Sequence, residues 1–104
     1  MYIRAPGSQN MRFAWDDQKS RSNLAKHAVS FETARLVFDD PRAVSRLDRV
    51  EGGEERWQTP GLAGGIVVLL VAHTYREEGG EEVIRIICAR KATPHERKSY
   101  EQGI

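Results

Sequence analysis

The sequence predicts an α+β domain in which a twisted antiparallel sheet follows two helices and precedes one short helix. Three observations support this prediction. Four strand-like runs between residues 43 and 89 are joined by short loops that contain glycine, as in β-hairpins. Asp16 and Ser30 are placed to cap two helices ahead of these runs. The segment Thr93–Glu96 has the residues of a capping box, with proline at the first helical position, and predicts a third helix.

The chain has 104 residues, which suits one domain with a modest core. Residues 1–10 show no hydrophobic period, so we expect a flexible leader before a single domain over residues 11–104. The net charge of +1, from 16 basic and 15 acidic residues, does not by itself indicate a nucleic-acid-binding protein. Residues 84–98 nevertheless hold five basic side chains and one acidic side chain, so a near-neutral total can hide a basic face.

The sequence argues against several kinds of protein and site. A single cysteine excludes an internal disulfide framework and a cysteine-rich metal site. The histidines are widely spaced and no glycine-rich phosphate loop occurs, so neither a metal nor a cofactor is expected. The longest apolar run, residues 66–72, is too short to span a bilayer, and the N-terminus lacks the apolar segment of a secretory signal. We therefore expect a cytoplasmic protein without membrane contact.

The first elements are a short strand and a helix. Residues 11–15 alternate between apolar and other side chains and predict the strand. Asp16 is expected to cap a helix that runs from Asp17 to about His27. Four polar side chains share one side of this helix: Lys19, Asn23, Lys26 and His27. This side is either an ordinary solvated face or the wall of a basic groove with one titratable imidazole.

A second helix is expected from Phe31 to about Phe38, after the cap Ser30. Its apolar residues recur at helical spacing and form the stripe that faces the core: Phe31, Ala34, Val37 and Phe38. The segment Asp39–Pro41 should end this helix, because the residue before a proline avoids the helical region.

Four strands are then expected in an antiparallel meander: residues 43–50, 55–59, 66–75 and 83–89. The connections between them are short and contain glycine: residues 51–54, 60–65 and 77–82. The last helix should run from Pro94 to about Gln102, and Gly103 is placed to end it.

The strand over residues 83–89 contains an arginine between apolar residues. Strict alternation would put Ile84, Ile86 and Cys88 on one face, which predicts Cys88 as a small core residue. Arg85 would lie on the other face. An arginine in such a strand either extends over a neighbour or points into a cleft where an anion binds.

The polar residues that remain are of the types that cleave RNA without a metal. In that reaction the substrate supplies its 2′-hydroxyl as nucleophile, and the enzyme supplies a base, an acid and cations that stabilise charge on the phosphorus. Arginine suits the cationic role because its planar fork fits two phosphate oxygens. The cationic candidates are Arg56, Arg85 and Arg90, and the candidates for base or acid are Glu55, Lys19, His27 and His73.

Each of these residues also has a structural interpretation. Glu55 and Arg56 could form an ordinary surface ion pair. His73 could be a hydrogen-bonded strand histidine, and Tyr100 is expected to pack from the last helix onto the sheet. Spacing does not choose between these interpretations and the catalytic one.

An ordered set of segments resembles the BrnT-type toxins. The opening signature spans Phe13–Lys19 and Asn23–Ala34, and the later segments follow in the same order: Val37–Pro41, Glu54–Trp57, Ile84–Ala92, Glu96–Arg97 and Tyr100. The match covers roughly residues 11–103. Departures are small, with Ala28 where the family often has glycine and Cys88 where serine is common.

The resemblance implies a bacterial type II toxin with a RelE-like fold, whose metal-independent endoribonuclease activity inhibits translation. It implies a cognate DNA-binding antitoxin, BrnA-like and of the ribbon–helix–helix type, through which the complex contacts operator DNA. The catalytic candidates are then Glu55, Arg56, Arg85 and His27, and the RNA-binding candidates are Lys19, Lys26, Arg90 and His73.

Two other interpretations of the sequence stay open. The chain could be a non-catalytic binding module, a co-repressor subunit whose basic face docks an acidic partner segment. It could also be a soluble α+β domain whose arginines only pair with carboxylates of the acidic loop over residues 77–82. Growth arrest on expression of the chain alone would favour the toxin.

Overall fold

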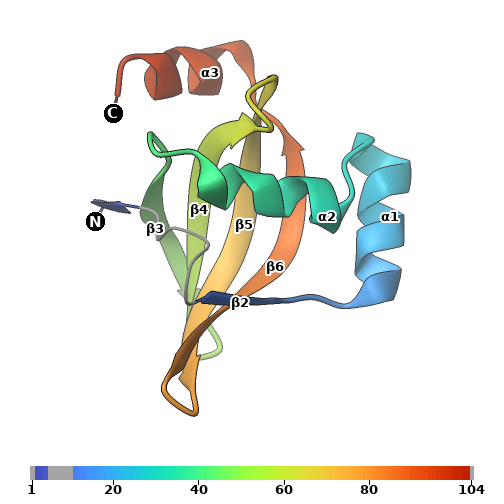
Figure 1. The fold of residues 1–104 in the computed structure, drawn as a ribbon, viewed down its shortest axis with the longest axis vertical. Coiled ribbons are helices and arrows are strands. Elements are labelled where there is room, and N and C mark those ends of the chain that lie inside the picture. The colour runs from blue at the N-terminus through green and yellow to red at the C-terminus, as the bar shows by residue number, and fades with distance from the viewer. Residues whose placement is uncertain (1, 5–10, 104) are drawn as a thin grey trace.

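The computed structural model describes residues 2–4 and 11–103, which form one six-stranded sheet with helices packed against it (Figure 1). The strand order is β1-β3-β4-β5-β6-β2. The strand bounds are Tyr2–Arg4 (β1), Met11–Ala14 (β2), Val44–Glu51 (β3), Glu54–Ala63 (β4), Val67–Glu78 (β5) and Glu81–Lys91 (β6). The predicted α+β class and the hairpin order of the four central strands are confirmed.

The sheet is mixed, which corrects the expectation of a wholly antiparallel one. Strands β3 to β6 form the antiparallel meander, but β2 pairs with β6 in parallel, with Phe13 opposite Ile84 and Ala14 opposite Arg85. Parallel pairing needs a long connection, and the whole meander separates β2 from β6 in the chain. Strand β1 pairs with β3 and lies within the predicted leader. Residues 1 and 5–10 of that leader lie outside the described residues.

Helix α1 (Asp17–His27) begins and ends at residues that suit those positions. The Asp16 carboxylate accepts hydrogen bonds from the backbone N–H groups of Gln18 and Lys19, at 2.8 and 3.2 Å, as predicted for an N-cap. At the other end Ala28 takes φ 60°, a left-handed conformation that favours glycine. Ala28 therefore adopts a backbone conformation that glycine would adopt at lower cost.

The second predicted helix has its expected extent but changes its winding. Helix α2 (Phe31–Ala34) is a single turn capped by Ser30, and a 3₁₀ helix, η1 (Arg35–Asp39), continues it. Helix α3 (Pro94–Glu101) has the predicted capping box between Thr93 and Glu96. None of the helices in the described ranges is long and apolar enough to cross a membrane.

Helix α2 lies across one face of the sheet, and α1 lies beside β6 (Figure 1). We call this the covered face, since it carries the main apolar cluster: Val29, Phe31, Ala34, Val37, Phe38, Ala63, Leu69, Val71, Ile84, Ile86 and Ala89. The opposite side is the open face, where α3 packs only at one end, over Pro60 and Leu70. The fold thus leaves most of one sheet face free of helices.

A β-bulge in β6 changes which face its later residues occupy. His73 pairs with Ile86 and Ala72 pairs with Cys88, so that Ile87 is an extra residue on β6. The bulge shifts the alternation by one residue, which puts Ala89 in the core and exposes Cys88 on the open face. The prediction that Cys88 is a core residue is therefore wrong.

Candidate functional site

A row of arginines crosses the open face. Residues opposite one another in an antiparallel sheet share a face, and the register pairs Thr74 with Arg85 and Arg49 with Arg56. Trp57 pairs with His73, so the same register continued by one residue sets Arg56 beside Thr74. Arg49, Arg56, Thr74 and Arg85 therefore form one line across four strands, which we call the arginine row. With strands about 4.8 Å apart, the Cα atoms of Arg56 and Arg85 are roughly 10 Å apart.

Arg85 is the cation of this row whose charge is least compensated. Arg49 pairs with Glu51 at 3.2 Å, and Arg56 lies 3.7 Å from Glu54. Arg85 is exposed and forms no ion pair or side-chain hydrogen bond with another described residue. Its five N–H donors are therefore available to an anionic ligand.

Two buried polar atoms at the centre of the row have no partner among the described residues. They are Nε of Arg56 and Oγ1 of Thr74, a residue with 1% of its surface exposed. A buried polar atom left unpaired costs about 1–3 kcal/mol, and functional sites are one place where proteins retain such atoms. Two of the three such atoms among the described residues therefore lie in the row, and the third is Nδ1 of His73 on the other face of the sheet.

The structure separates the predicted pair Glu55 and Arg56. Neighbouring residues of a strand point to opposite faces, so Glu55, opposite Val50, lies on the other side of β4 from Arg56. The carboxylate beside the row belongs to Glu54, which pairs with Arg76 at 3.1 Å and lies 3.7 Å from Arg56. The sequence analysis did not name Glu54 as a candidate. Residues two apart in a strand share a face, so its spacing from Arg56 could have indicated it.

The cations predicted on α1 lie beside the edge of the sheet. Lys19, Lys26 and His27 are all exposed. Asn23, between them, is buried and bonds the edge of β6: its Nδ2 donates to the carbonyl oxygen of Ala89 at 2.7 Å, and its Oδ1 accepts from the Ala89 N–H at 3.1 Å. Because Lys19 and His27 are one turn from Asn23 on either side, they flank this edge.

His73 does not lie at the surface, contrary to its assignment as an RNA-binding residue. It is fully buried on the covered face, where its ring contacts those of Phe38 and Tyr75 at centroid distances of 5.0 Å. Its Nε2 is 2.6 Å from Oγ1 of Thr59, which in turn is 2.6 Å from Oγ of Ser45. The structural interpretation of this histidine, a hydrogen-bonded residue within the sheet, is the correct one.

Burial lowers the pKa of His73 to about 4, because the charged imidazolium would lose its hydration. The unfolded chain binds a proton at this residue below about pH 6.5, whereas the folded protein binds it only below about pH 4. The free energy of unfolding should therefore fall as the pH falls from 6.5 to 4. An NMR titration of the His73 ring should find it neutral at pH 5.5; a protonated ring at that pH would contradict this account.

Arg90 holds the start of α3. Its Nη1 and Nη2 donate to the two carboxylate oxygens of Glu96, at 2.7 and 2.9 Å, and Nη1 also donates to the backbone oxygen of Lys91 at 3.3 Å. These bonds from Arg90 lower the pKa of Glu96 to about 2. The predicted RNA-binding arginine is thus already paired within the protein and positions the helix.

Glu96→Gln should lower the free energy of unfolding by about 1 kcal/mol at pH 7, since solvent weakens a half-exposed ion pair. Glutamine can still close the capping box, so the change chiefly removes the charge. In the native protein the folded pKa of Glu96 is lowered from 4.5, so this stabilisation is present above about pH 4.5 and is lost towards pH 2. Urea unfolding at pH 7 and pH 3 should show a difference between the two proteins that is clearly smaller at pH 3 than at pH 7.

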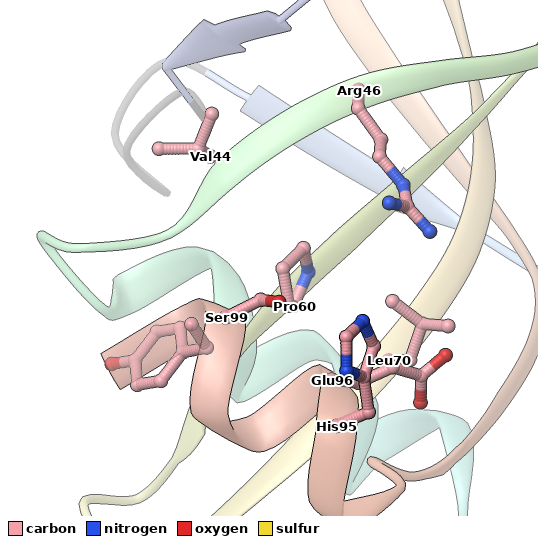
Figure 2. A pocket seen from close by; sticks show the side chains of 8 residues that line it. Val44, Arg46, Pro60, Leu70, His95, Glu96 and Ser99 are labelled. Atoms are coloured by element: carbon pink, nitrogen blue, oxygen red, sulfur yellow. The ribbon is translucent and has the colours of Figure 1, made fainter. Parts of the chain in front are cut away.

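Tyr100 packs against the sheet, as predicted. It is 5% exposed and its hydroxyl donates to the Asp40 carboxylate, which also accepts from the Leu62 N–H at 2.8 Å. Burial, together with the negative charge of Asp40, raises the pKa of Tyr100 to about 12. A hollow of about 140 Å³ lies between α3 and the strands. Figure 2 shows Pro60 and Leu70 on its sheet side and His95 on α3. Helix α3 therefore closes one end of the open face.

Residues 2–4 and 11–103 contain no group of three His, Cys, Asp or Glu side chains arranged to hold a metal ion. The residues that the structure brings together are cationic instead. Arg49, Arg56 and Arg85 form the row, Arg76 follows Thr74 on the same face, and Lys19 and His27 stand at the adjoining edge. Such a surface suits an extended anion with several charges, because each guanidinium can bind two phosphate oxygens.

Comparisons with known proteins agree with the resemblance seen in the sequence. A family model described as "Ribonuclease toxin, BrnT, of type II toxin-antitoxin system" matches residues 15–96. The crystal structure of the Brucella abortus ribonuclease toxin BrnT matches this chain with a TM-score of 0.56 and 21% sequence identity. The match covers 80% of this chain and 97% of the Brucella chain, so the two share a fold. No curated protein matches the sequence. Because the family model covers most of the chain, this protein belongs to the BrnT family of ribonuclease toxins of type II toxin–antitoxin systems.

Proposed function

We propose that this protein is a metal-independent endoribonuclease of RelE-like type that cleaves RNA on the open face and thereby inhibits translation in the cytoplasm. The observation that supports this proposal most directly is the arginine row, with Arg85 exposed and unpaired among the described residues. A DNA-binding antitoxin of the BrnA-like, ribbon–helix–helix type would neutralise the toxin. Contact with operator DNA would then be made through that antitoxin alone.

The proposed reaction uses the 2′-hydroxyl of RNA as the nucleophile. The 2′-oxygen attacks the adjacent phosphorus, a base takes its proton, and the bond to the 5′-oxygen breaks as an acid protonates that oxygen. The products are a 2′,3′-cyclic phosphate and a free 5′-hydroxyl. Arg56 and Arg85 would stabilise the charge that builds on the phosphoryl oxygens, which is the step where cations have the largest effect.

The proton-transfer groups are a separate part of the proposal. His27, exposed at the end of α1, is the candidate base, with Lys19 and Lys26 guiding the RNA along the same edge. Glu54 would hold Arg56 and Arg76 in place through its ion pairs. Glu55 points away from the row, which favours Glu54 as the carboxylate of the site.

Controlled expression in growing bacterial cells tests this function. Expression of the chain alone should stop growth and reduce the amount of full-length messenger RNA, whereas the double variant Arg56→Ala/Arg85→Ala should do neither. The variant must accumulate to the same level as the native protein for the comparison to hold. Normal growth in the presence of folded native protein would contradict the proposal and would favour a binding module.

A further inference from the structure

A hollow of about 310 Å³ adjoins the arginine row where β2 leads into α1. Ala14 and Val83 form an apolar part of its lining, and Arg76 and Arg85 are its cations. The register places these four residues on the open face, since Arg76 is opposite Val83 and Ala14 is opposite Arg85. Glu78 also lines the hollow, but its carboxylate already pairs with Arg12 at 2.9 Å and lies 3.7 Å from Arg76. Among these lining residues, Arg85 is the one that also takes part in the phosphate contacts proposed above, so the hollow extends beyond those contacts.

Asp16 also lines the hollow, and its carboxylate is held in place by α1. One oxygen, Oδ1, accepts both capping bonds from the backbone of α1. The other oxygen, Oδ2, has no hydrogen-bond partner among residues 2–4 and 11–103. The hollow therefore contains a fixed, negatively charged acceptor whose remaining oxygen is available to a ligand.

The donors and acceptors of the hollow are complementary to one nucleobase. A flat ring can lie on the apolar lining, and a carboxylate accepts hydrogen bonds from ring N–H and amino groups. Arginine donates to the O6 and N7 acceptors of guanine. Guanine is the base that combines those acceptors with adjacent N1–H and N2–H₂ donors. Adenine and cytosine each offer only a single amino donor on the same edge.

We propose that this hollow is a guanine-binding subsite, in which Oδ2 of Asp16, the oxygen that is not used for capping, accepts from N1–H and N2–H₂ and the Arg85 or Arg76 guanidinium donates to O6. The inference rests on the proposed ribonuclease function, and it adds a preference for guanosine next to the cleaved phosphate. It also assigns Asp16 a second role beside helix capping. A protein that contacted only the phosphates would, by contrast, cleave RNA with little sequence preference.

Asp16→Asn separates these two roles of Asp16. Asparagine caps a helix about as well as aspartate does, so α1 should form normally. The variant replaces a charged acceptor oxygen with an amide, however, and so should lose discrimination between bases. Asp17→Asn is the matched control, because Asp17 is the next residue, is exposed and pairs with Arg21 rather than lining the hollow.

The experiment compares cleavage of three short 5′-labelled RNAs that differ at one position, occupied by guanosine, inosine or adenosine. Inosine lacks only the N2 amino group. A hydrogen bond to a charged group contributes about 1.5–3 kcal/mol, so the native protein and Asp17→Asn should cleave the guanosine RNA about tenfold or more faster than the inosine RNA. Asp16→Asn should cleave the two at nearly equal rates.

The outcomes distinguish this inference from the function on which it rests. Equal cleavage of all three RNAs by the native protein, or an unchanged guanosine preference in Asp16→Asn, would overturn the guanine subsite and leave the ribonuclease function standing. A folded native protein that cleaves none of the three would contradict the ribonuclease function itself. Circular dichroism of each variant checks that α1 is intact.

Discussion

Arg85→Ala should reduce the rate of RNA cleavage by about 100-fold or more, the usual effect of removing one preorganised charge-stabilising group from an active site. The side chain is exposed and forms no ion pair with another described residue, so the folded state should be little affected. Initial rates on a labelled RNA measure the first expectation, and thermal unfolding measures the second.

Two companion variants sharpen this test. Arg85→Lys keeps the charge but loses the planar fork, so its rate should fall between those of the native protein and Arg85→Ala. Arg97→Ala removes an exposed arginine from α3, outside the arginine row, and should cleave at nearly the native rate. An Arg85→Ala protein that folds and cleaves as fast as Arg97→Ala would show that the row is not the active surface.

Asn23→Ala should lower the free energy of unfolding by about 3 kcal/mol, because it breaks buried hydrogen bonds and leaves backbone groups unpaired. The Asn23 amide donates to the carbonyl oxygens of Val29 and Ala89, at 2.8 and 2.7 Å, and accepts from the Ala89 N–H. Urea unfolding measures the loss. Ser22→Ala, at an exposed position of the same helix, is the control.

The Asn23 variant also tests how α1 is attached to the sheet. Strand β2 covers the edge of β6 only as far as Arg85, and the Asn23 side chain bonds to that edge at Ala89. A free energy of unfolding within about 0.5 kcal/mol of that of the control, the range of ordinary surface substitutions, would mean that this link is not needed. In that case the position of Lys19 and His27 would have to depend on other contacts.

Local sequence signals predicted most of the secondary structure. The caps at Asp16, Ser30 and Thr93 are properties of a few adjacent residues, and so are the glycine turns of the hairpins. The parallel pairing of β2 with β6 could not be predicted in this way. It joins residues that are 71 apart in the sequence, and no short-range pattern encodes the direction of such a pair.

The structure agrees with the sequence on where some candidate residues lie and differs on others, because side-chain faces depend on strand details. Arg56 and Arg85 could be identified because an arginine in a strand calls for an explanation, and the register places both on the open face. The bulge at Ile87 reversed the face that was expected for Cys88. Glu55 and Arg56 are neighbours in β4 and therefore point to opposite faces. A single-residue shift moves a side chain to the other face, so faces depend on details of register that composition does not reveal.

His73 illustrates the limit of reading a strand histidine from the sequence. It was a candidate for acid–base chemistry or RNA binding, but its ring contacts those of Phe38 and Tyr75 on the covered face. The feature that decides this is the packing of η1 across the sheet, which brings Phe38 over β5. Such contacts between distant segments are available only from the folded structure.

The most direct test of the central claim is the chemistry of the RNA ends produced by the purified protein in the presence of EDTA. The account predicts cleavage that persists without divalent metal and leaves a 2′,3′-cyclic phosphate and a 5′-hydroxyl. Cleavage that stops on addition of EDTA would contradict the account, because a metal ion rather than the arginine row would then stabilise the charge. Products with a 3′-hydroxyl and a 5′-phosphate would also contradict it, because the 2′-hydroxyl would then not be the nucleophile.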